Sequence, residues 1–222
     1  MKSCNRFILL TLLLLGTLFS SAFGASPEEL VQMGLNYSNG TGVPLDKTKA
    51  FECWKEAAQQ GHPQAQFILG VCYANGEGVN QDFTEATKWF RKAAEQGNAN
   101  AQFYLGINYE KGRGVEKNQS EAAAWFRKAA LQGHPQAQCC LGVYYTNGFG
   151  VPQDDSEASK WFRKSAEQGD MNAQFYLGLN YGLGRGVKKD QSEAVKWFRK
   201  AAQQGHQEAI DLLKALNEKI DN

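Results

Sequence analysis

One six-residue segment recurs along this chain at a constant spacing. Trp-Phe-Arg-Lys-Ala-Ala begins at residues 89, 125 and 197, and Trp-Phe-Arg-Lys-Ser-Ala begins at residue 161, so that successive copies start 36 residues apart. A fixed period of this length is typical of stacked repeat proteins, in which each unit buries its apolar face against its neighbours. A Gly-x-Gly-Val segment has the same period without any insertion, and its five copies begin at Gly40, Gly76, Gly112, Gly148 and Gly184.

Each repeat is predicted to form two short helices joined by the Gly-x-Gly-Val turn. Before the turn, Ala101, Leu105 and Tyr109 follow one another at intervals of four residues, which places them on one stripe of a helix. After the turn, an Asp or Asn stands three residues before a Glu, as at Asn118 and Glu121, and this spacing predicts a capping box. A glycine is then expected to end the second helix after about 14 residues. These glycines are Gly61, Gly97, Gly133, Gly169 and Gly205.

Two further patterns indicate how the helices pack. Every first helix has a glycine at the same position, after Met33 in the first repeat and after a leucine in the other four. Such a glycine weakens an isolated helix by roughly 1 kcal/mol relative to alanine, so its recurrence predicts the close approach of another helix. In the second helix, the spacing of Ala86, Trp89, Phe90 and Ala93 predicts an inward aromatic and alanine stripe, with the Arg-Lys pair facing out. The first-helix glycines are Gly34, Gly70, Gly106, Gly142 and Gly178.

The combined pattern resembles the Sel1-like repeat, a relative of the tetratricopeptide repeat. It reads Ala-x-x-x-Leu-Gly-x-x-Tyr-x-x-Gly-x-Gly-Val, followed by Ala-x-x-Trp-Phe-x-x-Ala-Ala-x-x-Gly, and it covers about residues 26–222. The resemblance implies an all-α fold, a right-handed α/α solenoid whose concave surface is lined by the first helix of each pair. It also implies an adaptor or scaffold in secretory, envelope or signalling complexes. The repeats are expected at about 29–64, 65–100, 101–136, 137–172 and 173–208, with a C-terminal capping helix at 209–222.

The chain departs from the family pattern at two places. In the first repeat, Cys53-Trp54 replaces Trp-Phe, and Glu29 replaces the alanine that begins the first-helix stripe. Cysteine-rich bacterial members of the family place two cysteines in each repeat across a helix junction, and this chain lacks that spacing.

The first 24 residues are predicted to be a cleavable signal peptide. Lys2 and Arg6 precede an uncharged apolar run at residues 7–19, and Ala22-Phe23-Gly24 then offers small residues for cleavage. A membrane anchor is the alternative, but spanning the hydrocarbon takes roughly 20 apolar residues. We therefore expect an exported protein, periplasmic or secreted, with a bacterial periplasm favoured over a eukaryotic lumen.

Charge excludes two classes of partner. Removing residues 1–24 takes away two basic residues and no acidic ones, which leaves 22 basic against 23 acidic side chains. A nearly neutral chain with interspersed charges has neither the basic footprint of a nucleic-acid binder nor a polybasic membrane patch. We expect a monomer that binds a protein or peptide, without nucleic acid and without stable membrane insertion.

No catalytic motif is recognisable, since Ser-x-x-Lys, Gly-x-Ser-x-Gly and His-Glu-x-x-His are all missing from the sequence. We therefore expect no catalytic residues and no cofactor. His62, His134 and His206 lie 72 residues apart, about 20 Å in a stack of helices, so one metal ion cannot join them and exposed turn positions are expected. Two alternatives stay open: a penicillin-binding or β-lactamase-like hydrolase, as described for some relatives, and an envelope protein that binds glycan.

Four cysteines follow the predicted signal peptide. Cys53 and Cys72 either form a disulfide between the first two repeats or are buried thiols that act as small apolar side chains. Cys139 and Cys140 are adjacent and are expected to be free thiols, because a ring between neighbouring cysteines strains the peptide.

The concave surface of the first helices is the predicted binding site. By analogy with related helical repeats, it is built from the third, seventh, tenth and eleventh positions counted from the first-helix alanine, and its apolar floor and amide rim suit an extended peptide or a partner helix. The alternative is that the recurring phenylalanines are packing residues between repeats. The predicted partner-binding residues are Phe67, Val71, Asn75, Phe103, Ile107, Glu110, Lys111, Tyr144, Asn147, Phe175 and Leu179.

Overall fold

The computed structural model describes residues 24–220, and side chains are described up to residue 216. Residues 1–23 of the predicted signal peptide therefore lie outside the described residues. Within that range, the regular secondary structure consists of eleven helices, as the repeat pattern predicts. They are α2 (Pro27–Asn39), α3 (Lys47–Gln59), α4 (Pro63–Asn75), α5 (Phe83–Glu95), α6 (Ala99–Lys111), α7 (Gln119–Leu131), α8 (Pro135–Asn147), α9 (Asp155–Glu167), α10 (Met171–Leu183), α11 (Gln191–Gln203) and α12 (Gln207–Ile220).

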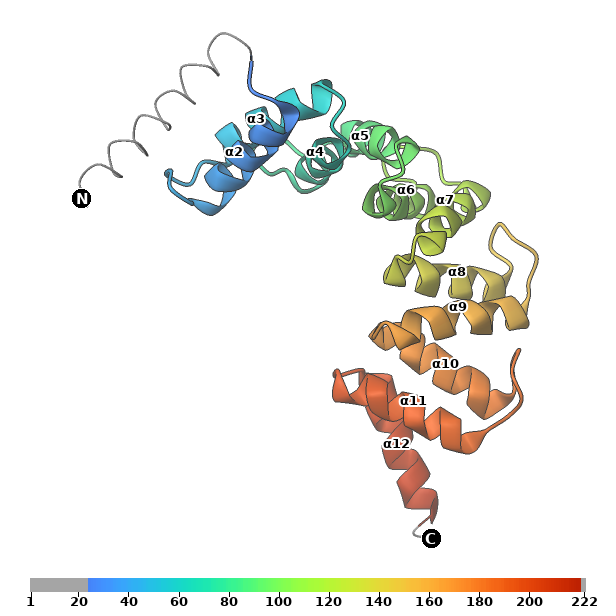
Figure 1. Cartoon of the computed structure of the whole chain (residues 1–222). Coiled ribbons are helices and arrows are strands. Elements are labelled where there is room, and N and C mark those ends of the chain that lie inside the picture. The colour runs from blue at the N-terminus through green and yellow to red at the C-terminus, as the bar shows by residue number, and fades with distance from the viewer. Residues whose placement is uncertain (1–23, 221–222) are drawn as a thin grey trace, which may run out of the picture. The chain divides into compact units, whose positions relative to one another are not determined.

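The helices belong to two compact units, residues 1–82 and residues 83–222. In the first unit, α3 packs against both α2 and α4. In the second unit, each helix from α5 to α12 packs against the next one along the chain (Figure 1). Such sequential packing is expected when the repeating unit is one helix pair, because the apolar stripe of each helix then contacts only the preceding and the following helix.

Side-chain caps begin the second helices, as the Asx positions predict. Asn118, Asp154 and Asp190 accept hydrogen bonds from the backbone N–H three residues later, at distances of 3.0 Å. The reciprocal half of the capping box differs from the prediction, because Glu157 binds the Lys160 ammonium at 2.6 Å instead of reaching back. A complete capping box forms at Ser26 and Glu29, where α2 begins.

The two glycines of the turn after α6 are required for different reasons. Gly112 ends the helix in the left-handed conformation, with φ of 68°, which glycine adopts most cheaply. Gly114 also has a positive φ, and a side chain there would collide with the carbonyl of Phe83. The turn therefore packs backbone against backbone on the start of the preceding second helix.

The first-helix glycines lie against aromatic rings, which confirms the predicted close approach. A Cβ atom placed on Gly106 would lie 2.7 Å from the Phe126 ring, and one on Gly142 would lie 2.6 Å from the Phe162 ring. Real Cβ contacts are essentially never this short. Phe126, Phe162 and Phe198 thus each fill the space that a glycine leaves on the first helix of the same pair.

The Arg-Lys pair of the repeated Trp-Phe-Arg-Lys-Ala-Ala segment faces solvent only in part. The Lys128 ammonium lies 3.7 Å from the centre of the Trp125 ring, and the Arg91 guanidinium donates to the Tyr109 hydroxyl at 2.6 Å. The pair therefore covers the aromatic residues of its own helix and of the next repeat, while its charges reach water.

Buried amides link consecutive helices of the second unit. Gln102 on α6 donates to the carbonyl of Ala94 on α5 at 3.1 Å, and its own side-chain oxygen accepts from Gln132 at the end of α7 at 2.7 Å. Gln138 and Gln174 repeat this arrangement in the next two repeats. Because a buried amide without partners is costly, these bonds help to fix the register of the stack.

The glycine–phenylalanine contact gives a stability prediction. We expect Gly142→Ala to lower the free energy of unfolding by about 1–3 kcal/mol, because the added methyl group overpacks the Phe162 ring by more than the gain in helix propensity. Gly182→Ala in α10 is the matched control, since its Cβ would lie 3.7 Å from Ala194, an ordinary contact. Denaturant unfolding that shows equal stability for Gly142→Ala and the unmodified chain would contradict this packing.

Candidate functional site

The first helices of the second unit carry a stripe of exposed and half-buried side chains. In α6 it consists of Asn100, Tyr104, Ile107 and Lys111, which are spaced as one helical face. The corresponding residues are exposed or half-buried in α8 and α10, and we call the whole set the first-helix stripe. Its other members are Gln136, Cys140, Val143 and Asn147 in α8, and Asn172, Tyr176, Leu179 and Leu183 in α10.

Two tyrosines of the first-helix stripe are held flat against the neighbouring helix. The Tyr104 ring stacks on Phe90 of α5 with centroids 5.3 Å apart, and the Tyr176 ring stacks on Phe162 of α9 at 5.1 Å. Even so, Tyr104 stays 41% exposed and Tyr176 36% exposed. A preorganised aromatic ring loses little conformational entropy when a ligand covers it, which makes it a good binding anchor.

The predicted residues Ile107, Lys111, Asn147 and Leu179 all lie on the first-helix stripe. In the first unit, Val71 and Asn75 occupy the corresponding face of α4, where Val71 is half-buried and Asn75 exposed.

The predicted residues Phe103 and Phe175 do not lie on the first-helix stripe. Phe103 packs between Phe126, with centroids 5.9 Å apart, and His134, with centroids 4.7 Å apart. Phe175 makes the same contacts with Phe198 and His206, at 5.9 Å and 4.3 Å. This placement supports the alternative that the phenylalanines are packing residues. Phe67 is also half-buried, in the equivalent position of α4.

Tyr144 lacks the accessibility expected of a partner-binding residue. Tyr144 is only 2% exposed, because its ring packs on Phe126 and Phe149, so a partner cannot reach it. Its hydroxyl donates to the half-buried carboxylate of Glu110 at 3.3 Å. Burial, with the Glu110 charge as a second cause, raises the pKa of the Tyr144 hydroxyl.

The sequence reasoning missed Tyr104 and Tyr176. Counted from the first-helix alanine, the phenylalanine at the third position was predicted to face the partner, whereas the tyrosine at the fourth position is the exposed residue. The spacing of Tyr104 from Ile107 and Lys111 is the signal that places them on one face.

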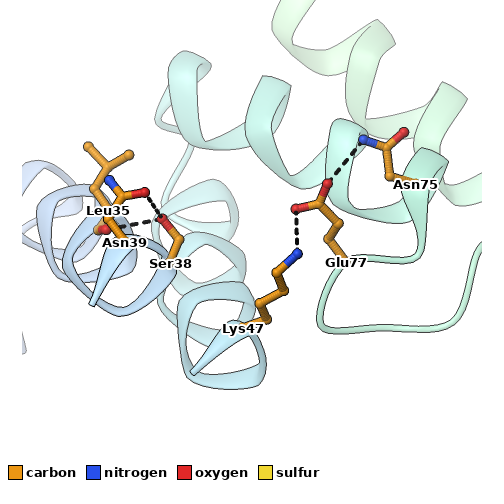
Figure 2. Close-up of polar contacts among 6 residues, drawn as sticks. All are labelled: Leu35, Ser38, Asn39, Lys47, Asn75 and Glu77. Atoms are coloured by element: carbon orange, nitrogen blue, oxygen red, sulfur yellow. Dashed lines mark hydrogen bonds and ion pairs between the residues drawn. The ribbon is translucent and has the colours of Figure 1, made fainter. Parts of the chain in front are cut away.

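In the first unit, a hollow of about 200 Å³, lined by both polar and apolar side chains, lies between α2, α3 and the turn after α4. The Lys47 ammonium lies 3.8 Å from the Glu77 carboxylate, which also accepts a 3.3 Å hydrogen bond from the predicted residue Asn75. Both contacts are drawn in Figure 2. On the other side of the hollow, Ser38 donates to the carbonyl of Leu35 at 3.0 Å. These groups satisfy one another, and both charged side chains are about half exposed, so the ion pair contributes little to stability.

The four cysteines among the described residues, Cys53, Cys72, Cys139 and Cys140, are free thiols, so no disulfide joins Cys53 to Cys72 there. Burial raises the pKa of Cys72 to about 12, and burial together with the Glu110 charge raises that of Cys140 to about 12. Burial also raises the pKa of Cys53 and of Cys139. A thiol with a raised pKa is a poor nucleophile at neutral pH.

The histidines are not exposed turn residues, contrary to the prediction. Nδ1 of His62, of His134 and of His206 each accepts the backbone N–H three residues later, at 3.2, 3.2 and 3.4 Å. Asn98 and Asp170 accept the same bond in α6 and α10. Among the residues with described side chains, no group of three His, Cys, Asp or Glu is arranged to hold a metal ion. No helix in residues 24–220 is long and apolar enough to cross a membrane.

Comparison with known proteins places the repeats in a family. The family model of the Sel1 repeat matches residues 30–62, 63–98, 99–134, 135–170 and 172–206. The chain is 40% identical to c5321, a protective antigen of uropathogenic Escherichia coli with an SLR fold, at a TM-score of 0.83 over 87% of this chain and 41% of that chain. It is 39% identical to a Sel1 repeat protein from Oxalobacter formigenes, at a TM-score of 0.79 over 86% of this chain and 78% of that chain. The search of curated proteins found no match.

The chain therefore spans less than half of the antigen's length and most of the length of the Oxalobacter protein.

His134 gives a prediction of pH dependence. Burial lowers its pKa below the ordinary value of 6.5, so the unfolded chain binds a proton that the folded chain resists. The stabilising contribution of neutral His134 is complete above pH 6.5 and is lost as the pH falls below that value.

We expect the thermal midpoint to fall more steeply between pH 7.5 and 5.5 in the unmodified chain than in His134→Asn. The variant carries the capping residue that α6 has at Asn98, which does not titrate. Identical pH profiles for the two chains would contradict the role of His134.

Proposed function

The chain belongs to the Sel1 repeat family, and from that premise we propose that it is an exported, non-catalytic scaffold that binds a partner protein on the first-helix stripe. Sel1 repeats typically mediate protein interactions, and the helix-turn-helix array is consistent with such a scaffold. Export is proposed from the order of basic, apolar and small residues in positions 1–24.

The observation that carries the binding site is the pair of stacked, exposed tyrosines. Tyr104 and Tyr176 lie beside the half-buried Ile107 and Leu179 on their own helices, so each helix offers an aromatic ring next to an aliphatic floor. Asn100, Gln136 and Asn172 at the start of the first-helix stripe, and Lys111 and Asn147 at its other end, supply hydrogen-bonding groups. A mixture of aromatic anchors and a polar rim is typical of protein-binding surfaces.

The chemistry of the described side chains also supports a binding role. The thiols have raised pKa values, and the histidines each use a ring nitrogen as a helix cap. Neither type of residue is therefore set up as a nucleophile or a general base.

The two tyrosines can be tested directly with selected peptides. Peptides from a random library are selected on immobilised residues 25–222, and their affinities are measured by titration calorimetry. For those that bind the first-helix stripe, we expect Tyr104→Ala/Tyr176→Ala to weaken binding roughly 10- to 30-fold, because truncation of an aromatic anchor costs about 2 kcal/mol.

Glu167→Ala on the exposed face of α9 is the control and should leave these affinities unchanged. The proposed site is wrong if every selected peptide binds the tyrosine variant as tightly as the unmodified chain.

A further inference from the structure

One junction of the second unit lacks a polar link that two others have. The Thr87 hydroxyl of α5 donates to the carbonyl of Arg113 at 2.9 Å and accepts from the Asn108 amide at 2.8 Å. Ser159 of α9 makes the same two bonds, to the carbonyl of Arg185 and from Asn180. At α7 the residue in this position is Ala123, which has no hydroxyl to bind the following turn.

A hollow of about 340 Å³ lies at this junction, between α7 and the turn that follows α8. We call it the α7 hollow. Its lining is mainly apolar and includes Ala123, Ala124, Leu131, Leu141 and Val151, while Arg127 and Lys128 supply its charges. Its volume is at the lower end of the range for ligand pockets, which suits one anchoring side chain better than a whole cofactor.

The outward residues of α7 also differ from those of the neighbouring second helices. Lys88, Lys160 and Lys196 pair with the glutamate three residues earlier at 2.6, 2.6 and 3.0 Å, whereas α7 has Ala124 in the lysine position. Leu131 is 69% exposed where α5 and α9 have glutamates. The usual charged surface is thus replaced by apolar atoms at the edge of the α7 hollow.

The positive charge at the edge of the α7 hollow indicates which group a bound peptide carries. Arg91 and Arg163 each donate to a tyrosine hydroxyl at 2.6 Å, whereas Arg127 has no hydrogen bond or ion pair with any residue whose side chain is described. The Lys128 ammonium lies over the Trp125 ring and reinforces the positive charge. A guanidinium with free donors binds a carboxylate in a bidentate fashion.

We propose that the α7 hollow is a second protein-binding site, which takes a peptide segment with an apolar side chain next to a carboxylate. The apolar side chain lies between Ala124, Leu131 and Val151, and the carboxylate, from Asp, Glu or a chain terminus, binds Arg127. The site lies on a second helix, so it is separate from the first-helix stripe and does not depend on it.

The test uses variants that restore the residues of the neighbouring helices and therefore keep the fold. Ala124→Lys/Leu131→Glu gives α7 the lysine of α9 and the glutamate of α5 and α9. Random 12-residue peptides are selected on residues 25–222 and counter-selected on this double variant. We expect the survivors to share an apolar residue next to an acidic residue or a free carboxyl terminus.

The survivors should bind Arg127→Ala at least 10-fold more weakly, and Tyr104→Ala/Tyr176→Ala with unchanged affinity. Arg199→Ala is the matched control, because Arg199 is the arginine of the same six-residue segment in α11, and it should leave the peptide affinities unchanged. Thermal unfolding checks that each variant is folded. The proposal is overturned if no peptide distinguishes the unmodified chain from the double variant. It is also overturned if the survivors lack an acidic group, or if binding is lost in the tyrosine variant instead.

Discussion

The contact between a second-helix phenylalanine and a first-helix glycine is the interaction on which the rest of the structure depends. Phe126, Phe162 and Phe198 each lie where a side chain on the facing glycine would overlap the ring. Removing one Cβ atom lets the two helices of a pair approach until the ring fills the gap, at the cost of a weaker isolated first helix. Trp54 makes the equivalent contact with Gly34 in the first unit. The lost helix propensity is recovered through burial of a whole aromatic ring.

This packing also decides which residues remain available for binding. The glycine side of α6, α8 and α10 packs against the second helix of the same pair. Phe103 and Phe175, which precede the two tyrosines, pack against that second helix and against the histidine that begins the next first helix or α12. The face that carries Tyr104 or Tyr176 is the one that reaches solvent. The tyrosines on that face are fixed by stacking on the preceding second helix. Several positions that differ between repeats are exposed ones, where packing does not dictate the residue, and Ala124 and Leu131 of α7 are examples.

The fold was predictable from the sequence because period, turns and caps all repeat. The 36-residue spacing, the Gly-x-Gly-Val turns and the Asx caps each indicate the same helix pairs, and agreement between such signals is strong evidence for a fold. The site was predictable only in part. Phe103 and Tyr104 are neighbours in the chain and flank the same buried stripe, so periodicity alone does not say which one a neighbouring helix covers. The α7 hollow depends on the approach of the turn after α8 to Ala123, which no local pattern reveals.

A double-mutant cycle on Gly142 and Phe162 tests the central contact most directly. Gly142→Ala, Phe162→Leu and the double variant are compared with the unmodified chain by denaturant unfolding. If the ring occupies the space above the glycine, the alanine will cost at least about 1 kcal/mol less when Phe162 is already shortened, since contacting residues show coupling energies of that size. Two losses of stability that simply add would contradict the account.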